Sequence, residues 1–154
     1  MSRAIPPTLV LAWGNPSRGD DALGPLFADA IAALQLPGVE CQCDFQLQIE
    51  HSLDLRGRQR VLFVDAARDD ALPDGAPFLL RPLQAMRDAS FSSHALSPAA
   101  LLQVYASTEA DAPPPAWLLG IGGHVWALGA PLSRAAQRHL QQALAWAGDW
   151  LRQR

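Results

Sequence analysis

Apolar residues along this chain occur in short runs and in stripes at helical spacing, separated by turns that contain glycine and proline. Three uninterrupted runs, over about residues 8–13, 60–65 and 117–121, are typical of strands buried on both faces of a sheet. Residues 39–47 alternate between apolar and polar side chains, which predicts a further strand. A weaker strand is expected over residues 76–80, with Pro82 ending it.

Helices are predicted where apolar residues recur every three or four positions. This spacing covers about residues 22–34, 98–106 and 133–152, and a short helix is expected over 50–55. Pro25 lies in the first turn of the first helix, where a missing N–H group is tolerated. Between these elements, residues 68–75, 83–93 and 111–115 are polar or rich in proline, which favours connecting loops.

The order of these elements predicts the fold class. Strands that alternate with helices indicate an α/β protein, with helices on both faces of a mostly parallel, twisted, five-stranded sheet. The strand at 76–80 follows the strand at 60–65 without an intervening helix, so we expect it to run antiparallel. The chain of 154 residues has the length of one domain, and we assign residues 1–154 to it.

Composition narrows the class of protein. Hydrophobic residues make up 49% and charged residues 18%, as in a globular protein, and the net charge of −3 argues against nucleic acid as the main partner. The N-terminal residues lack the apolar core of a signal peptide, and no apolar run approaches membrane-spanning length. Cys41 and Cys43 would share one strand face, where a disulfide would be strained. We therefore expect a reduced, cytoplasmic protein without a membrane partner.

Residues 8–34 contain the first candidate site. A buried strand leads into a turn at Gly14 and Gly19, and two carboxylates, Asp20 and Asp21, follow at the start of an apolar-striped helix. One interpretation is that Asp20 or Asp21 simply caps the helix, whose N-terminus favours negative charge. The other is that one carboxylate caps and the other holds a metal cation. A nucleotide site is a poor third choice, because the acidic pair would repel phosphate.

Two further segments place metal-binding side chains where the same site is expected. Asp65 ends the strand at 60–65, and His94 lies in the loop before the helix at 98–106. If the first and third strands are neighbours, Asp21, Asp65 and His94 can meet beyond their carboxyl ends. Two carboxylates and an imidazole suit Zn²⁺ or Ni²⁺ and leave a position open for water or substrate. Each residue also has a simpler explanation, as a turn cap or as a histidine in a surface loop.

The remaining polar residues are weaker candidates for a metal or catalytic site. Glu50 and His51 are adjacent on a short helix, so their side chains diverge and form a solvated or substrate-contacting pair rather than a shared metal site. His124 follows two glycines at a strand end, a position that suits a ligand contact, although a loop histidine is the simpler interpretation. His139 is expected near the surface of the last helix. No serine or cysteine has the neighbours of an activated nucleophile.

Several of these residues carry a resemblance to a known family. Gly14-Asn15, Gly19-Asp20-Asp21 and Gly24, following a first strand, resemble the opening motif of the hydrogenase maturation proteases. These endopeptidases trim the C-terminal extension from the large subunit of nickel-iron hydrogenases. Later segments of the family are similar to three stretches of this chain, and the resemblance spans roughly residues 8–150. The three stretches are Val64-Asp65-Ala66-Ala67, Ser92-Ser93-His94-Ala95-Leu96 and Leu132-Ser133.

The resemblance implies a fold, a reaction and a site. The fold would be a three-layer α/β/α arrangement of the phosphorylase/hydrolase-like kind, with one antiparallel strand among five. Asp21, Asp65 and His94 match the three metal-contacting positions and would be both the metal site and the catalytic site. Asp21 stands where some members have glutamate. The substrate would be a large-subunit precursor already loaded with nickel, so the nickel arrives with the substrate, and zinc or cadmium could occupy the site in a crystal. The enzyme would be a monomer.

One segment bears on which hydrogenase is processed. Many family members have a glycine-rich loop after the second strand, whereas this chain has the sequence from Asp44 to His51. That variant resembles proteases of soluble or bidirectional hydrogenases. A different class of function also stays open, namely a non-catalytic module or chaperone that checks the large subunit for nickel.

Overall fold

A computed structural model describes residues 4–86 and 96–153 of the chain. Its centre is a five-stranded sheet in the order β2-β1-β3-β5-β4. Strands β2, β1, β3 and β5 pair in parallel, and β4 pairs with β5 in the antiparallel direction, as the sequence predicts. The strands are β1 (Thr8–Trp13), β2 (Val39–Asp44), β3 (Arg60–Arg68), β4 (Phe78–Leu83) and β5 (Ala116–Gly123).

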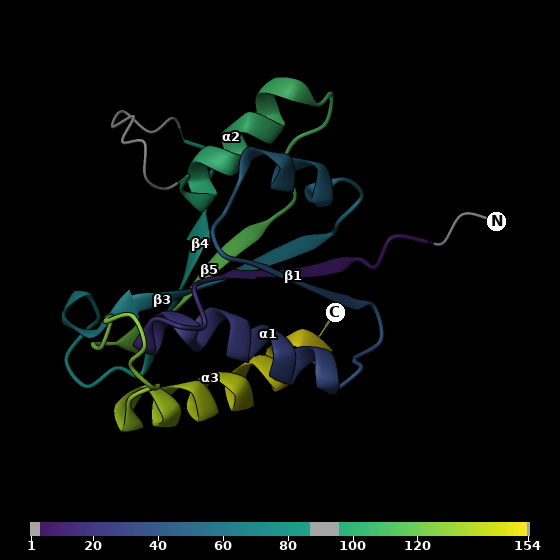
Figure 1. The fold of residues 1–154 in the computed structure, drawn as a ribbon. Coiled ribbons are helices and arrows are strands. Elements are labelled where there is room, and N and C mark those ends of the chain that lie inside the picture. The colour runs from purple at the N-terminus through teal and green to yellow at the C-terminus, as the bar shows by residue number, and fades with distance from the viewer. Residues whose placement is uncertain (1–3, 87–95, 154) are drawn as a thin grey trace.

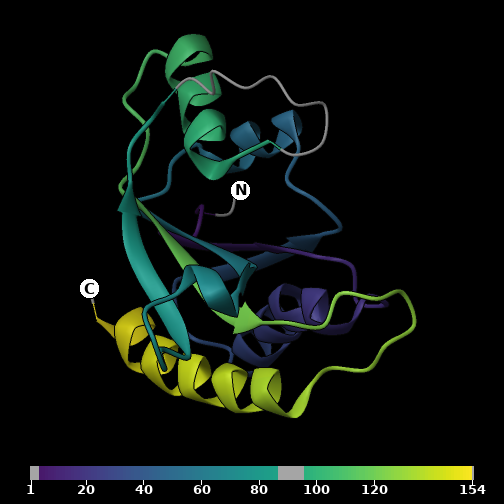
Figure 2. The same ribbon diagram turned by 90° about the vertical axis from the view of Figure 1, so that its left-hand side faces the viewer.

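Helices cover both faces of the sheet, which confirms the three-layer architecture (Figures 1 and 2). Helices α1 (Leu23–Ala33) and α3 (Arg134–Arg152) lie on one face. Helix α2 (Pro98–Thr108) and the 3₁₀ helix η2 (Ile49–Leu55) lie on the other. Two shorter 3₁₀ helices, η1 (Gly19–Ala22) and η3 (Asp69–Ala71), follow β1 and β3. Within the described residues, no helix is both long and apolar enough to cross a membrane.

Two apolar clusters, one on each face, hold the layers together. In β1, Val10 is fully buried against α1 and α3, whereas Leu9 and Leu11 are buried toward α2 and η2. This division follows from the alternation of side chains along a strand. Strand β3 repeats it, with Leu62 and Val64 on the first face and Phe63 on the second. Burial on both faces explains why these strands read as continuous apolar runs.

Strand β2 is shorter than its alternating sequence predicts. It ends at Asp44 instead of residue 47, and the expected common face breaks up beyond it. Phe45 is 67% exposed, whereas Leu47 is 5% exposed and packs into the cluster on the α2 face. The chain turns after Asp44 because the neighbouring strand β1 ends at the paired residue Trp13 and offers no further partner.

Two other strands run further than predicted. Strand β3 continues to Arg68 instead of ending at Asp65, because β5 supplies pairing partners as far as Gly123. Pro82 does not end β4 but lies within it, opposite Trp117. β4 is an edge strand with a neighbour on only one side, so a residue without an N–H group is tolerated there.

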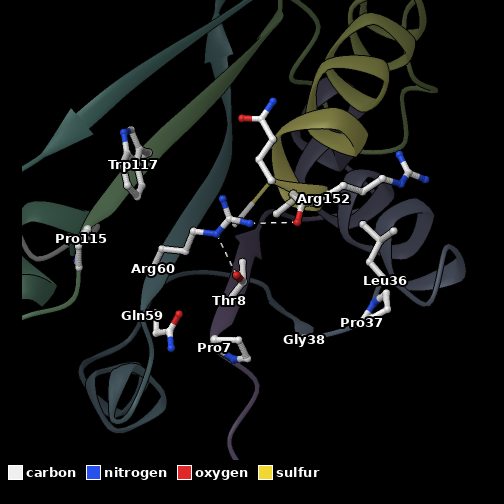
Figure 3. Close-up of a pocket in the computed structure, with 12 residues that line it drawn as sticks. Pro7, Thr8, Leu36, Pro37, Gly38, Gln59, Arg60, Pro115, Trp117 and Arg152 are labelled. Carbon is white, nitrogen blue, oxygen red and sulfur yellow. Dashed lines mark hydrogen bonds between the residues drawn. The ribbon is translucent and has the colours of Figure 1, made fainter.

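Arg60 joins three elements at the N-terminal end of the sheet (Figure 3). Its Nε donates to Thr8 Oγ1 at 2.9 Å, and its two Nη atoms donate to the carbonyl oxygens of Trp150 and Leu151 at 3.2 and 3.0 Å. The guanidinium also lies 4.4 Å from the centre of the Trp150 ring. The hollow of ≈ 590 Å³ that Arg60 lines is therefore at the opposite end of β3 from Asp65.

We expect Arg60→Met to lower the free energy of unfolding by about 2 kcal/mol, because the last carbonyl groups of α3 lose their charged donor. Arg152→Met is the matched control, since Arg152 is an exposed arginine lining the same hollow. Its loss should lie within about 0.5 kcal/mol. Urea denaturation of the two variants measures the difference, and equal losses would contradict the role of Arg60.

Candidate active site

The site lies where the order of strands reverses. From β1 the chain crosses through α1 to β2 on one side, whereas β3 pairs with β1 on the other side. In an open α/β sheet, the carboxyl ends of two such strands flank the crevice in which ligands bind. Ala12 is paired with Val64, so the last residue of β1, Trp13, lies beside Asp65.

Asp65 points toward the face that carries α2 and η2. It shares this face with Phe63, two residues earlier on β3, which belongs to the apolar cluster there. Burial and the negative charge of Asp21 raise the pKa of Asp65 to about 7, although the N–H groups of Ala66 and of the Trp13 indole donate to it and act in the opposite direction. Asp65 is thus a carboxyl group held partly away from water and beside a second carboxylate.

That second carboxylate, Asp21, comes from η1, and its orientation is set by the turn before it. The backbone N–H of Asn15 donates to Asp21 Oδ2 at 2.6 Å. Asp21 is partly buried and lies close enough for its charge to act on Asp65. The structure therefore brings two of the three predicted site residues together.

The third predicted residue, His94, lies outside the described residues, and so do Ser92, Ser93 and Ala95 of its motif. Among the residues that are described, no three histidine, cysteine, aspartate or glutamate side chains form a group that could hold a metal ion. The ligand role of Asp21, Asp65 and His94 accordingly stays a prediction.

Glycines allow the turn after β1 to fold tightly enough to place Asp21. Gly14 has φ +152°, and a side chain there would collide with the carbonyl oxygen of Asp21. A side chain at Gly24 would collide with the carbonyl oxygen of Trp13. The first turn of α1 therefore packs directly on the end of β1 only because both positions lack a Cβ atom.

Asp20 has a structural role that differs from the role proposed for Asp21. Its side chain is completely buried. Oδ1 accepts from the N–H of Ser133 at 2.8 Å, and Oδ2 accepts from Ser133 Oγ and from the N–H groups of His124 and Val125 at 2.9 to 3.0 Å. Burial by itself raises the pKa of Asp20, but these donors outweigh it and leave the pKa below its usual value.

The interpretation of Asp20 or Asp21 as a simple cap of the following helix is wrong. Neither η1 nor α1 has a side-chain hydrogen bond at its N-terminus. Asp20 instead fixes the segment that connects β5 to α3, and Ser133 in turn caps α3 through Ala136 N–H. This contact spans 113 residues in sequence, which explains why the local pattern did not indicate it.

Solved structures of similar fold come from bacteria and archaea. HycI from Thermococcus kodakarensis KOD1, a [NiFe] hydrogenase maturation protease, is 20% identical, with a TM-score of 0.71 over 94% of this chain and 91% of that one. The hydrogenase maturating endopeptidase HybD from E. coli is 21% identical, with a TM-score of 0.72 over the same shares. A hydrogenase 2 maturation peptidase from Thaumarchaeota archaeon SCGC_AB-539-E09 is 21% identical, with a TM-score of 0.65 over 94% and 97%.

The chain has the fold of the hydrogenase maturation proteases. No protein-family model matches it, and no curated protein matches it in sequence. The likeness therefore rests on three-dimensional structure, and at this level of identity it concerns the fold.

Within this maturation-protease fold, His51 differs from its prediction as half of a solvated pair. Glu50 is exposed, but His51 is only 9% exposed. Its Nδ1 accepts from the N–H of Gln48 at 2.8 Å, so its proton lies on Nε2, which faces Asp44 Oδ2 at 3.4 Å. His51 thus fixes the turn between β2 and η2, and its nitrogen atoms already face protein groups.

The two other described histidines lie near the end of β5. His124 is an exposed loop residue, as predicted, with Nδ1 3.8 Å from Asp20 Oδ2 and 3.7 Å from Asp69 Oδ2. His139 is partly buried rather than superficial, and its Nδ1 is hydrogen-bonded to the carbonyl oxygen of Gly122 at 2.8 Å. The polar partners of both histidines are thus Asp20, Asp69 and the backbone of β5.

Neither cysteine has the environment of a nucleophile. Both are free, as expected. Burial, with a contribution from Glu40, raises the pKa of Cys41 to about 11, and burial also raises the pKa of Cys43. Because the thiolate is the reactive form, a raised pKa leaves both thiols less reactive than an ordinary cysteine at neutral pH.

Proposed function

We propose that this protein is an endopeptidase that removes the C-terminal extension of a nickel-loaded [NiFe]-hydrogenase large-subunit precursor. The observation that carries the proposal is the pairing of Asp21 and Asp65 at the strand-order reversal of a maturation-protease fold. The acidic motif after β1 and the Asp65 strand are the parts of the sequence that resemble the family. Their proximity gives that resemblance a physical basis.

The two carboxylates have the chemistry of a divalent-cation site. Burial and, second to it, the charge of Asp21 raise the pKa of Asp65, so ionising both carboxyl groups is unfavourable without a cation. A divalent ion would offset this repulsion, and His94 is the proposed third ligand. Carboxylate and imidazole ligands suit Ni²⁺ and Zn²⁺. We propose that the ion is the nickel carried by the precursor, so that it belongs to the substrate.

The surrounding residues would prepare the carboxylates for that substrate. Asn15 N–H holds one oxygen of Asp21, and the N–H groups of Trp13 and Ala66 donate to Asp65. The remaining lone pairs of the two carboxylates would be available to the nickel. Binding the ion would thus position the chain segment of the precursor that contains the scissile bond. Since neither cysteine thiol has the lowered pKa of an activated nucleophile, we propose direct attack by water on the peptide carbonyl.

The finer identity of the substrate rests on the β2–η2 segment. Asp44 to His51 replaces the glycine-rich loop of many family members and resembles the variant of soluble or bidirectional hydrogenases. We therefore propose a precursor of that group as the partner. We also propose that the enzyme works as a monomer in the cytoplasm.

The proposal is tested with purified precursor in two forms, with and without nickel. Chelator-treated enzyme is expected to shorten only the nickel-loaded form, because two carboxylates and one imidazole bind the ion firmly only when the substrate adds its own ligands. Mass spectrometry of the precursor measures the loss of the C-terminal peptide.

Three outcomes would contradict this proposal in different ways. Equal shortening of both forms would show that the protein is a protease whose cleavage does not depend on nickel in the precursor. Activity that returns only after zinc is added to the enzyme would make the metal a resident cofactor. Tight binding of the nickel-loaded form without any shortening would support the non-catalytic checking module instead.

A further inference from the structure

We infer that a groove beside Asp65, on the α2 face of the sheet, is the subsite for an aliphatic side chain of the precursor close to the scissile bond. This inference rests on the proposed function, which it extends from the reaction to substrate specificity. The groove has a volume of ≈ 140 Å³. Residues of β3, β4, β5 and the η3 region line it, among them Ala67, Leu72, Leu79, Arg81, Leu118 and Gly120.

Strand alternation places the groove on the same face as Asp65. Ala67 is two residues beyond Asp65 on β3, so both side chains point to one side of the sheet. On β5, Leu118 packs against the cluster of the α2 face, and Gly120 follows it at the same spacing. Gly120 is paired directly with Asp65. The groove therefore begins one strand away from the proposed catalytic carboxylate.

The floor of the groove is open because its residues are small. Gly120 presents no side chain, and a Cβ atom there would lie 3.1 Å from Cβ of Ala67. Larger residues at either position would fill the space above β5, between the side chains of β3 and those of the edge strand β4. Leu72 closes one end, beyond η3.

The far wall comes from β4. Leu79 is paired with Gly120, and Arg81 is paired with Leu118, so both side chains point to this face. Leu79 is 39% exposed, which leaves apolar surface free for contact. Arg81 is exposed at the rim and forms no ion pair with any described residue.

These features select one kind of occupant. An apolar floor with an apolar wall binds an aliphatic side chain, and an unpaired guanidinium at the rim favours an acidic side chain next to it. Adjacent strands are about 5 Å apart, so β4 lies roughly 10 Å from Asp65. An extended peptide advances about 3.3 Å per residue, which places the bound side chain within about three residues of the scissile bond. The occupant is therefore the segment of the precursor that flanks this bond.

The test combines enzyme variants with a scan of the precursor. Each of the three residues on either side of the scissile bond is changed to glycine in turn, and kcat/KM is measured with the nickel-loaded form. For wild type, we expect one aliphatic position at which glycine lowers kcat/KM about 10- to 100-fold. Ala67→Leu fills the groove, so its kcat/KM with the native precursor should be low. Changing the sensitive position to glycine should lower this value little further.

Leu79→Ala and Ala145→Leu complete the test. Leu79→Ala widens the groove, so a precursor with phenylalanine at the sensitive position should be cleaved about 10-fold faster by this variant than by wild type. Ala145 is exposed on α3, and Ala145→Leu makes the same chemical change as Ala67→Leu far from the groove. It should leave every rate unchanged.

The inference and the proposed function fail in distinguishable ways. The subsite would be overturned if Ala67→Leu cleaved the native precursor at the wild-type rate. It would also be overturned if glycine at the sensitive position lowered kcat/KM of Ala67→Leu by the same factor as that of wild type. Either result would leave the proposed protease activity intact. If Ala67→Leu does not fold, Leu79→Ala decides. The subsite would be overturned if this variant cleaved the phenylalanine-containing precursor no faster than wild type. Absence of cleavage by wild type itself would defeat the proposed function and the subsite with it.

Discussion

Asp65→Asn is expected to slow processing of the nickel-loaded precursor by on the order of 10²- to 10³-fold, the usual cost of losing one electrostatic contact at a reacting centre. Asparagine has nearly the same shape as aspartate but carries no charge, so the repulsion with Asp21 disappears together with the attraction for a cation. We expect a similar loss for Asp21→Asn and for His94→Ala. The rate of release of the C-terminal peptide measures all three.

The same substitution should not weaken the fold, because the pKa of Asp65 is raised on folding. The usual value of an aspartate is 3.8 and the folded value is about 7, so the folded state favours the protonated form. Stability contributed by that preference is present at low pH and lost as the pH rises toward 7. Asp65→Asn should therefore unfold at pH 8 at the same temperature as wild type or higher.

Asp29→Asn is the control for this experiment, because Asp29 is an exposed carboxylate on α1. It should change neither the processing rate nor the melting temperature. A processing rate of Asp65→Asn equal to that of wild type would remove Asp65 from the site. A large drop in its melting temperature at pH 8 would show that the carboxylate is needed for folding.

Asp20→Asn is expected to lower the free energy of unfolding by about 3 kcal/mol or more. Four donors converge on the two oxygens of this fully buried side chain. An amide retains one oxygen, so its NH₂ group would face donors whichever way it turns. Because the contacts join η1 to the start of α3, the loss should appear in the global unfolding transition measured with urea.

The pH dependence separates this role from a general packing defect. The pKa of Asp20 lies below its usual value of 3.8, so its contribution is complete well above pH 3.8 and is lost as the pH falls through the folded value. Asp20→Asn should thus be least stable relative to wild type at neutral pH, with the difference shrinking in acid. A constant difference from pH 7 to pH 3 would contradict the assignment. Asp29→Asn again serves as the exposed control, with a loss within about 0.5 kcal/mol.

The sequence by itself determined the layers of the fold and offered Asp21 and Asp65 as candidates for the site. Continuous apolar runs in β1, β3 and β5 predict strands buried on both faces, because such strands need apolar residues at every position. Apolar spacing in α1 and α3, and the short polar connection without an α-helix between β3 and β4, completed the topology. Asp21 and Asp65 could be proposed from the sequence because each acid follows or ends a predicted strand, and their role in a site stays a prediction.

The tertiary structure decided where strands end and what each acid does. Strand length depends on the neighbour: β2 stops where β1 stops, whereas β3 continues as long as β5 accompanies it. Asp20 and Asp21 are adjacent and chemically identical, yet one is buried under donors from a segment more than 100 residues away and the other lies beside Asp65. Such contacts join residues distant in sequence, and only the folding of the chain around the sheet brings them together.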